Sequence, residues 1–412
     1  MKLTKTIKIK IGKLSKNKQN ILDRLLNKNT KAINFCLNKA KKGEIITHSL
    51  VYKGLRKYNL PATVIHGARA KSVEIIKSFY KIKGKSFPVL KNLRVRFDNV
   101  IVKLRHTNNK LYPNFISLLY KARKNKNDNR IELPLIINSI YQKEIIKQIG
   151  KEFKLGATEL VKYKDNFYVH ISYSKEVNLP IPNRDFTPIG IDIGITNLAV
   201  SVAPSSVRFH SGQRVKWKNH FFREQRRKLQ ENFSIKEIKR LRNRQTRYND
   251  FQIHNIAKNI VTQAKEENNP VIVMEDLTWI TEKTIRNIRK SQRMKHNDWV
   301  WKRLQRAIEY KANWENIPVK YVEGAYTSQI CCKCGIKNKR IKNIYKCKSC
   351  GFEVNADYNA GRNIAKRFFN TICVEEQASI NNAFNSIIPE SIKAETDSIV
   401  KNNTEGGGFL WQ

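Results

Sequence analysis

The segment "IGIDIGITNLAVSV", residues 189–202, decides the fold of the second half of this 412-residue chain. It is a nearly continuous apolar run, which is typical of a strand buried on both faces of a sheet. Asp192 interrupts the run between Ile191 and Ile193. The segment therefore predicts a central strand that carries one carboxylate.

Strand and helix patterns alternate after this segment. A basic and apolar helical stretch covers about 220–268, and the short buried strand "VIVMEDL" follows at 271–277. A helix is predicted near 299–316, and the strand "PVKYVEG" at 318–324. This order of elements predicts an α/β domain.

The first half of the chain has a different pattern. Residues 2–12 alternate polar and apolar side chains as a strand would, and helical spacing begins at Ile21 and Leu25 and continues through 67–81. Short strand patterns come next, which predicts a small β-domain with a helical insertion. Residues 178–188 contain three prolines and no clear period, so we predict a linker there. The expected fold class is α+β, with more than one domain.

The composition predicts a polyanionic partner. Lys and Arg number 80 against 34 Asp and Glu, which gives a formal net charge of +46. An excess of this size repels itself unless something negative neutralises it, and nucleic acid is the natural candidate. No stretch approaches the roughly 18 consecutive apolar residues of a membrane span. We expect a soluble, cytoplasmic protein with no membrane partner.

Four of the seven cysteines form two CxxC pairs, each followed by glycine. Cys331 pairs with Cys334, and Cys347 pairs with Cys350. Cys332 is a competing ligand, but Cys331 restores the two-residue gap. Four thiolates in two such turns form the closed tetrahedral site that zinc prefers, and this leaves no open position for a substrate. The spacing predicts one structural Zn²⁺.

Three carboxylates are the candidates for catalysis. Asp192 and Glu275 each stand in a strand of buried apolar residues, where an unpaired charge costs several kcal/mol. Asp357 heads a predicted helix, where a helix cap is the simpler explanation. Asp276 competes with Glu275, and strand alternation makes the two point to opposite faces.

Together these acids indicate a hydrolytic metal site. Three carboxylates on separate elements of one domain, inside a strongly basic protein, suggest a two-metal phosphodiesterase. The acids would hold two Mg²⁺ ions about 3.5–4 Å apart.

Several motifs resemble those of one known family. The motifs "GIDIGITNLAV", "VMEDL", "YTSQICCKCG" and "CKSCGFEVNADYNAGRNIA" lie within about 189–366. In order and approximate spacing they resemble the TnpB family of transposon-encoded RNA-guided DNA endonucleases, which are relatives of the type V CRISPR effectors. The first half of the chain resembles this family only in general pattern.

The resemblance implies a RuvC-like nuclease domain of RNase H fold with an inserted zinc ribbon. It implies that Asp192, Glu275 and Asp357 are the catalytic residues and the Mg²⁺ ligands. It also implies an N-terminal β-barrel, called the wedge, with a helical recognition insertion. The expected segments are the wedge at 1–14 and 86–180, the helical insertion at 15–85, the RuvC-like nuclease at 181–325 and 354–372, the zinc ribbon (a target nucleic-acid-binding module) at 326–353, and a flexible C-terminal tail at 373–412.

The implied function is RNA-guided DNA cleavage. The implied partners are a guide RNA from the transposon end and double-stranded DNA with a short flanking motif. A companion transposase encoded by the same element is a further candidate partner. Three alternatives stay open: a guided DNA-binding regulator that does not cleave, an unguided RNase H-like nuclease, and a CRISPR-type miniature effector.

Basic residues gather on the helical stretch 221–251. Such a helix can lie along a phosphate backbone, although a solvated helix face with an apolar stripe toward the sheet is also compatible with the pattern. The candidate nucleic-acid contacts are Arg223, Arg226, Arg227, Arg240, Arg244 and Arg247.

Overall fold

The computed structural model describes residues 1–82, 86–91, 94–108, 111–121, 129–241, 243–277, 301–338 and 343–387. The chain divides into two compact units, Met1–Glu176 and Val177–Gln412. In the described residues, no helix is both long enough and apolar enough to cross a membrane.

A seven-stranded antiparallel sheet forms the body of the first unit. Its strand order is β2-β6-β7-β1-β5-β4-β3, so the first strand of the chain lies in the middle. The strands are β1 (Lys2–Ile11), β2 (Arg94–Phe97), β3 (Val102–His106), β4 (Asn114–Leu119), β5 (Arg130–Ile136), β6 (Lys154–Tyr163) and β7 (Asn166–Glu176).

The β-barrel that the resemblance implies is not confirmed by this sheet. Strands β2 and β3 are its two edges, and the sheet as described contains no ladder between them. They are joined by Asp98 and a single 3₁₀ turn, η1 (Asn99–Ile101). Four residues span at most about 14 Å, so the connection draws the two edges together. The result is a curled open sheet.

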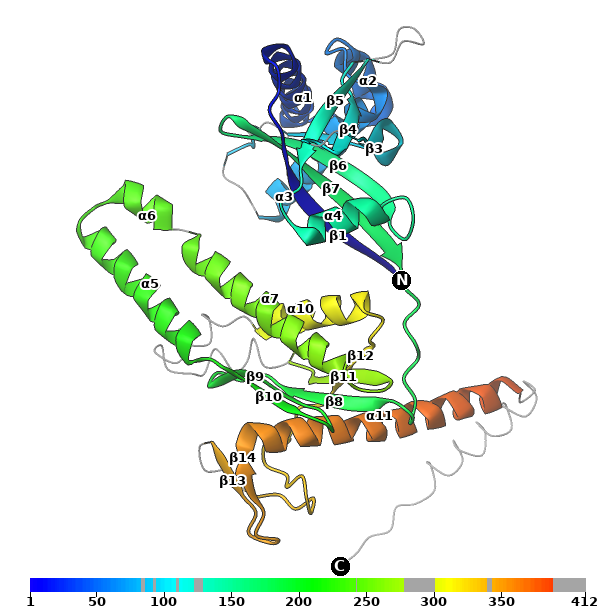
Figure 1. Ribbon diagram of the computed structural model, residues 1–412, viewed down its shortest axis with the longest axis vertical. Coiled ribbons are helices and arrows are strands. Elements are labelled where there is room, and N and C mark those ends of the chain that lie inside the picture. Colours follow the sequence, from blue (N-terminus) through cyan, green and yellow to red (C-terminus); the bar gives the residue numbers. More distant parts are fainter. Residues whose placement is uncertain are drawn as a thin grey trace, which may run out of the picture. The chain divides into compact units, whose positions relative to one another are not determined.

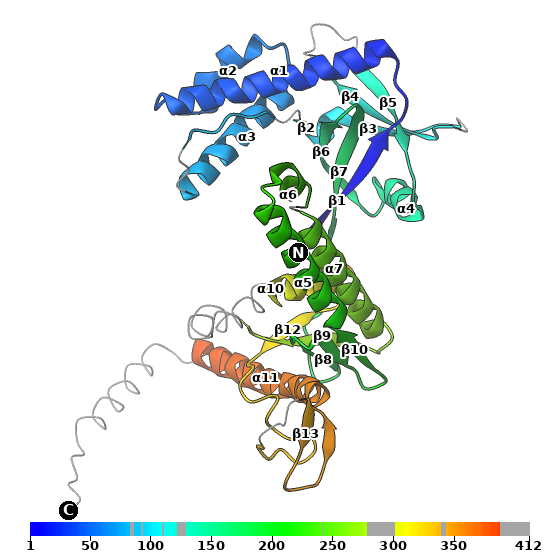
Figure 2. The ribbon, with the colours of Figure 1, turned by 90° about the vertical axis from the view of Figure 1, so that its left-hand side faces the viewer.

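Helices lie beside this sheet, as Figure 2 shows. They are α1 (Lys16–Lys41), α2 (His48–Arg56), α3 (Ala62–Lys81) and α4 (Ile140–Gln148). Helix α1 begins after Ser15, whose hydroxyl accepts a hydrogen bond from the backbone N–H of Lys18. Helices α1 and α3 pack on each other and both contact β2. The predicted strand at the N-terminus and the helices after it are therefore present.

A five-stranded mixed sheet organises the second unit, in the order β10-β9-β8-β11-β12. Strand β8 pairs antiparallel with β9 and parallel with β11, and β12 continues the parallel half. The strands are β8 (Thr187–Asp192), β9 (Asn197–Val202), β10 (Val207–Ser211), β11 (Pro270–Glu275) and β12 (Val319–Val322). The apolar segment 189–202 thus forms two neighbouring strands, and β8 is the central one.

Helices cover both faces of this sheet (Figure 1). Helices α7 (Arg244–Ala264) and α10 (Trp301–Trp314) bury one face through a core that includes Ile191, Met274 and Ile308. Helix α11 (Ala356–Ile387) covers the opposite face, where Ile364 and Phe368 pack on Val273. A small hairpin of β13 (Ile344–Lys346) and β14 (Glu353–Asn355) precedes α11.

The predicted helical stretch at about 220–268 consists of three helices: α5 (Gln213–Glu231), α6 (Ile235–Leu241) and α7. Phe233 adopts φ 50°, while its N–H bonds Gln230 and the N–H of Ser234 bonds Leu229. These bonds form a Schellman motif, which usually requires glycine, so the sequence shows no obvious stop.

The predicted tail at 373–412 also differs from the structure. Helix α11 continues past Cys373 to Ile387, and residues 388–412 lie outside the described part of the chain.

Candidate functional site

Asp192 and Glu275 end two neighbouring parallel strands. The register of β8 and β11 pairs Ile191 with Met274, so the next position along places Asp192 beside Glu275. Ile191 and Met274 belong to the core under α7 and α10. Because side chains alternate along a strand, both carboxylates lie on the face that α11 covers.

Asp357 comes to the same end of β8 from the first turn of α11. The helix crosses the strand closely, because a Cβ atom at Gly190 would overlap the carbonyl oxygen of Gly361. Asp192 lies two residues beyond Gly190, and Asp357 lies one helical turn before Gly361. Asn197, at the start of β9, donates a hydrogen bond of 2.8 Å to Asp357 Oδ2.

Glu275 is contacted by the segment that follows β12. Thr327 Oγ1 donates a hydrogen bond to Glu275 Oε1, and a Cβ atom at Gly324 would lie 3.2 Å from the carboxyl carbon. Burial raises the pKa of Glu275 above its ordinary value, although the Thr327 hydrogen bond and the nearby Arg367 act in the opposite direction. In the absence of a cation this carboxylate carries a desolvation cost.

Asp276 belongs to the other face of the sheet. It lies two positions beyond Met274, whose side chain packs under α7 and α10, and its own side chain is exposed. Its backbone N–H donates a hydrogen bond of 2.9 Å to Val322 O. The alternation therefore separates Asp276 from the face that α11 covers.

The three carboxylates share one edge of the sheet but do not form a tight ligand cluster. In the described residues, their oxygens are not all within 4.8 Å of one another, whereas the sulfurs of one cysteine set are. Mutual repulsion opposes closer approach of carboxylates when no cation lies between them. Their oxygens are the hard donors that Mg²⁺ takes.

The four cysteines of the two CxxC pairs form one cluster. The sulfurs of Cys331 and Cys350 lie 3.8 Å apart, and those of Cys334 and Cys347 lie 3.5 Å apart. Each pair is followed by a glycine with positive φ, +80° at Gly335 and +69° at Gly351, where a side chain would be strained. These cysteines could bind a metal ion.

A backbone N–H group near each CxxC pair favours the thiolate form of one cysteine. The N–H of Cys350 lowers the pKa of Cys347 to about 6. The N–H of Ile336 likewise favours the Cys334 thiolate, but burial and the neighbouring sulfurs outweigh it and raise the pKa of Cys334 to about 12. Several thiolates this close together require a cation to be stable together.

Cys332 is not a member of the cluster. Its backbone N–H donates a hydrogen bond of 2.9 Å to Asn359 Oδ1 on α11, and its carbonyl accepts one from Lys366. Burial raises the pKa of its thiol. Asn363 Nδ2 donates to the carbonyls of Thr327 and Ile330, at 2.8 and 2.7 Å.

These contacts identify residues that the sequence analysis missed. Thr327 and Asn197 hold two of the carboxylates, and buried Asn359 and Asn363 fasten the start of the cysteine module to α11. The sequence holds one signal of this, because Asn359 and Asn363 lie four residues apart and therefore on one face of the predicted helix. Polar residues at helical spacing that are also buried indicate specific partners.

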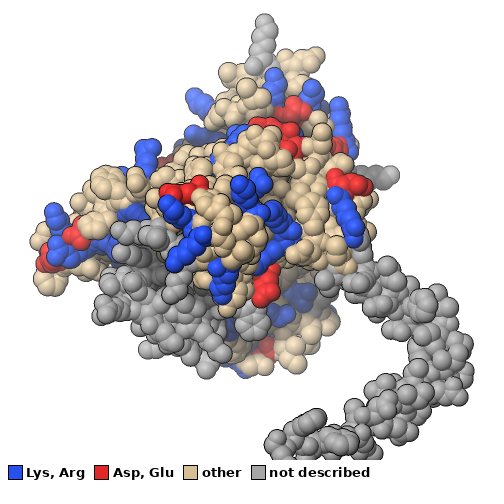
Figure 3. Space-filling model, turned by 90° about the horizontal axis from the view of Figure 1, so that it is seen from below, with Lys and Arg blue, Asp and Glu red and all other residues tan. Residues whose placement is uncertain are grey.

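The six candidate arginines are spread over three helices. Arg223, Arg226 and Arg227 lie on α5, Arg240 on α6, and Arg244 and Arg247 on α7. Arg227 pairs with Glu224 at 3.0 Å and Arg240 with Glu237 at 2.8 Å, both at the surface. More Lys and Arg than Asp and Glu side chains are visible on the face shown in Figure 3.

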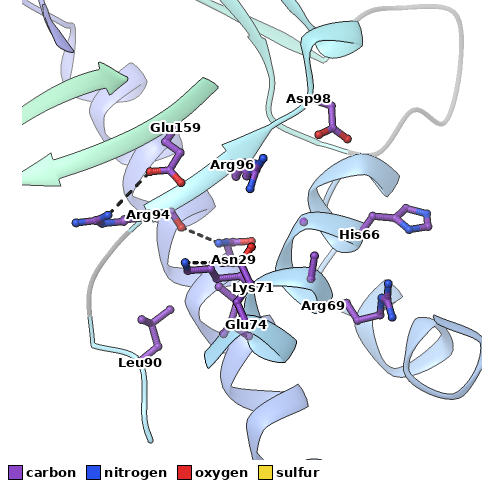
Figure 4. Close-up of a pocket in the computed structure, with 13 residues that line it drawn as sticks. Asn29, His66, Arg69, Lys71, Glu74, Leu90, Arg94, Arg96, Asp98 and Glu159 are labelled. Atoms are coloured by element: carbon purple, nitrogen blue, oxygen red, sulfur yellow. Dashed lines mark hydrogen bonds and ion pairs between the residues drawn. The ribbon is translucent and has the colours of Figure 1, made fainter. Parts of the chain in front are cut away.

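A cavity of about 320 Å³ lies in the first unit, where α1 and α3 meet β2 (Figure 4). Its charges are largely matched. Arg94 faces Glu159 at 3.9 Å, Lys71 pairs with Glu74 at 2.8 Å, and Asn29 donates a hydrogen bond to the Arg94 carbonyl. The hydrogen bond from Asn29 joins α1 to β2, and none of the three candidate carboxylates lines the cavity.

Comparisons with known proteins identify relatives of this chain. Residues 301–364, which include α10, β12, the cysteine module and the start of α11, match the family model described as "Cas12f1-like, TNB domain". A CRISPR-associated endodeoxyribonuclease Cas12f1 of Sulfoacidibacillus thermotolerans is 28% identical over 274 residues, 61% of this chain and 63% of that protein. The chain therefore spans less than two thirds of that relative.

A second relative covers more of its own length. A TnpB-like protein of Methanocaldococcus jannaschii is 30% identical over 245 residues, 56% of this chain and 85% of the relative. A solved structure described as the Cas12f1-sgRNA-target DNA complex shares the fold, with a TM-score of 0.59, 17% identity and coverage of 85% of this chain and 83% of that one.

Fold and site together define an α+β protein with an acidic sheet edge and an adjacent cysteine module. The chain belongs to the family of TnpB-like proteins.

Proposed function

We propose that this chain is an RNA-guided DNA endonuclease with one RuvC-like active site. The observation that carries the proposal is the meeting of Asp192, Glu275 and Asp357 at one edge of the sheet, from three distant parts of the sequence. Family membership and the endodeoxyribonuclease named above support the reaction class. The similar Cas12f1 structure contains sgRNA and target DNA, which supports guide RNA and target DNA as partners.

The carboxylates fit two Mg²⁺ ions as catalytic cofactors. Their oxygen donors match the preference of Mg²⁺, and a cation would offset the desolvation that raises the pKa of Glu275. Bound Mg²⁺ supplies activation of water and neutralisation of charge on the cleaved phosphodiester. The chain's own contribution is orientation: Thr327 holds Glu275, and Asn197 holds Asp357.

The cysteine cluster fits one structural Zn²⁺. Four sulfurs within 4.8 Å of one another are soft donors in the number that tetrahedral zinc takes. The module is bonded to α11 through Asn359 and Asn363, and Thr327 at its start reaches Glu275. Zinc held there would fix the segment that positions the active site.

The finer organisation stays part of the proposal. The second unit would be the RuvC-like nuclease with its inserted zinc ribbon, and the curled sheet of the first unit would be the wedge with its helical recognition insertion. A short flanking DNA motif and a companion transposase remain predictions.

The experiment begins with the RNA that co-purifies with the chain when it is expressed with its native downstream flank. Sequencing should find one abundant structured RNA with a variable end, and a guide built on it should direct Mg²⁺-dependent cutting of a matched duplex. Asp192→Ala should abolish the cutting and keep RNA-dependent binding. Asp276→Ala, the matched control on the other face, should cut at the wild-type rate.

Two results would refute this proposal. Heterogeneous host RNA, lost at high salt, would favour an unguided nuclease. Guided binding with no cutting by the wild-type chain, with Mg²⁺ present, would favour a DNA-binding regulator.

A further inference from the structure

Helix α5 carries two exposed aromatic side chains that stack on each other. Trp217 is 63% exposed and Phe221 is 38% exposed. Their ring centroids lie 5.8 Å apart with an interplanar angle of 18°. Exposed Trp and Phe side chains are costly in water, so a stacked pair of them on a surface indicates a partner.

The pair is separate from the face that α5 uses to pack. Val215, Asn219 and Phe222 are the buried residues of this helix, at positions that repeat every three to four residues. Trp217 and Phe221 are one turn apart on a neighbouring stripe. The Trp217 ring, 63% exposed, lies mainly in solvent, and the Phe221 ring also meets the buried Phe222 ring edge-on at 5.9 Å.

Positive charge surrounds the pair. Lys218 Nζ lies 5.4 Å from the Trp217 ring centroid and 4.9 Å from that of Phe221. Arg214, one turn before Trp217, is exposed, as is Lys216. An apolar protein surface would leave these charges without counter-ions, whereas a nucleotide offers a flat base to the rings and a phosphate to the cations.

Helix α5 starts beside the end of the sheet where Asp192, Glu275 and Asp357 lie, which we call the acidic edge. The N–H of Gly212, which precedes α5, donates a hydrogen bond of 2.8 Å to Thr196 O, in the loop that follows Asp192. A Cβ atom at Gly212 would lie 2.7 Å from Ile195 O, so this contact is close. At a rise of about 1.5 Å per residue, Trp217 lies roughly 8 Å along the helix from that loop.

We propose that Trp217 and Phe221 are a stacking platform for an unpaired base of a single-stranded nucleic acid leading to the carboxylates. Lys218 and Arg214 bind the adjoining phosphates. This inference rests on the proposed nuclease function and adds a substrate form to it, because bases are free to stack on protein rings only where the strand is unpaired. Trp217 is a positioning residue for the strand.

For the test, the full chain is first freed of nucleic acid at high salt. Binding of a labelled 20-nucleotide oligo-dT is then measured without Mg²⁺. Trp217→Ala should weaken binding about 5- to 150-fold, the range for loss of one stacked base. Trp217→Phe should restore most of the affinity. Phe233→Ala is the matched control, because Phe233 is also an exposed aromatic residue, 87% exposed, at the end of the same helix.

A second oligonucleotide, which has phosphates but no bases, shows whether Trp217 binds a base or a phosphate. An oligonucleotide of the same length made of abasic sites should bind wild type and Trp217→Ala equally. Equal weakening of both oligonucleotides would overturn the proposal, as would unchanged oligo-dT binding by Trp217→Ala. A smaller molar mass of that variant in light scattering, with oligo-dT binding unchanged, would show that the rings join two copies of the chain.

The two proposals fail in different ways. If only the platform is wrong, cutting still depends on Asp192. If only the nuclease is wrong, Trp217→Ala still loses oligo-dT binding, while the wild-type chain with guide and Mg²⁺ does not cut, or its cutting is unchanged by Asp192→Ala.

Discussion

The acidic edge and the cysteine cluster differ in how they are built. The four cysteines come from one stretch, 331–350, and two short turns bring them together. The carboxylates come from β8, β11 and α11, and depend on the whole sheet for their placement. Metal binding in a local closed cluster is coupled to folding, whereas a buried carboxylate costs stability until a ligand arrives. We therefore expect a metal in the cysteine cluster to stabilise the fold, and the fold to hold the three carboxylates in place.

The largest effect on stability should come from the cysteine cluster. Cys347→Ser should reduce bound zinc from one ion per chain to none and lower the unfolding free energy by on the order of 4 kcal/mol, since the loss of a structural metal is among the most damaging changes. Metal analysis and urea unfolding would measure both. Cys332→Ser, the neighbouring thiol outside the cluster, should keep the zinc; a loss of zinc there instead would show that the cluster is wrongly assigned.

Replacing a candidate metal ligand at the acidic edge should change the free energy of unfolding in the opposite direction. Glu275→Gln removes a charge that burial disfavours, so the zinc-loaded protein without Mg²⁺ should become more stable, while guided cutting is lost. Added Mg²⁺ should then stabilise the wild type more than the variant. A variant less stable than the wild type without Mg²⁺ would contradict this account of the acidic edge.

The pH dependence of this difference follows from the raised pKa of Glu275. A carboxyl group with a raised folded-state pKa contributes stability that is complete below its unfolded value of about 4.3 and is lost as pH rises through the folded value. The unfolding free energy of Glu275→Gln minus that of the wild type should therefore be small near pH 4, increase with pH, and become constant. Urea unfolding in Mg²⁺-free buffer across this range would measure it, and a difference independent of pH would exclude titration of Glu275 as the cause.

Loss of the hydrogen bond that links the two sites, from Thr327 to Glu275, should have a smaller effect than loss of either site. Thr327→Val removes the hydroxyl that bonds Glu275, and loss of such an outer contact typically costs about 10- to 100-fold in metal affinity or activity. The Mg²⁺ concentration at half-maximal cutting would measure this cost. Thr371→Val is the control, because Thr371 Oγ1 donates a hydrogen bond of 3.0 Å to the carbonyl of Arg367, within α11. Equal losses in both variants would show that the loss does not come from the bond to Glu275.

The sequence was sufficient for what depends on local pattern. Strands at β8 and β11, a helix beginning at Asp357 and the choice of Cys331 over Cys332 as a cluster member all follow from alternation, apolar runs and spacing. Helix α4 was missed although Ser139 and Gln142 have the spacing of a capping box: Ser139 Oγ accepts a hydrogen bond from the Gln142 N–H, and Gln142 Oε1 accepts one from the Asn138 N–H. The bond from Thr327 to Glu275 joins residues 52 apart and depends on packing that no local pattern encodes.

The smallest effects should come from the exposed helices, which belong to neither site. Arg226→Ala on α5 should leave the unfolding free energy within about 0.5 kcal/mol of the wild type, as is usual for surface changes. If Arg226 meets a phosphate, the slope of log affinity for DNA against log salt should fall by about 0.7–0.9. Arg208→Ala is the control, because both carboxylate oxygens of Glu266, at 2.8 and 2.7 Å, already engage that guanidinium. An unchanged slope for Arg226→Ala would assign this arginine to the solvated face of α5, and nucleic-acid contact would then have to come from the remaining arginines of α5–α7.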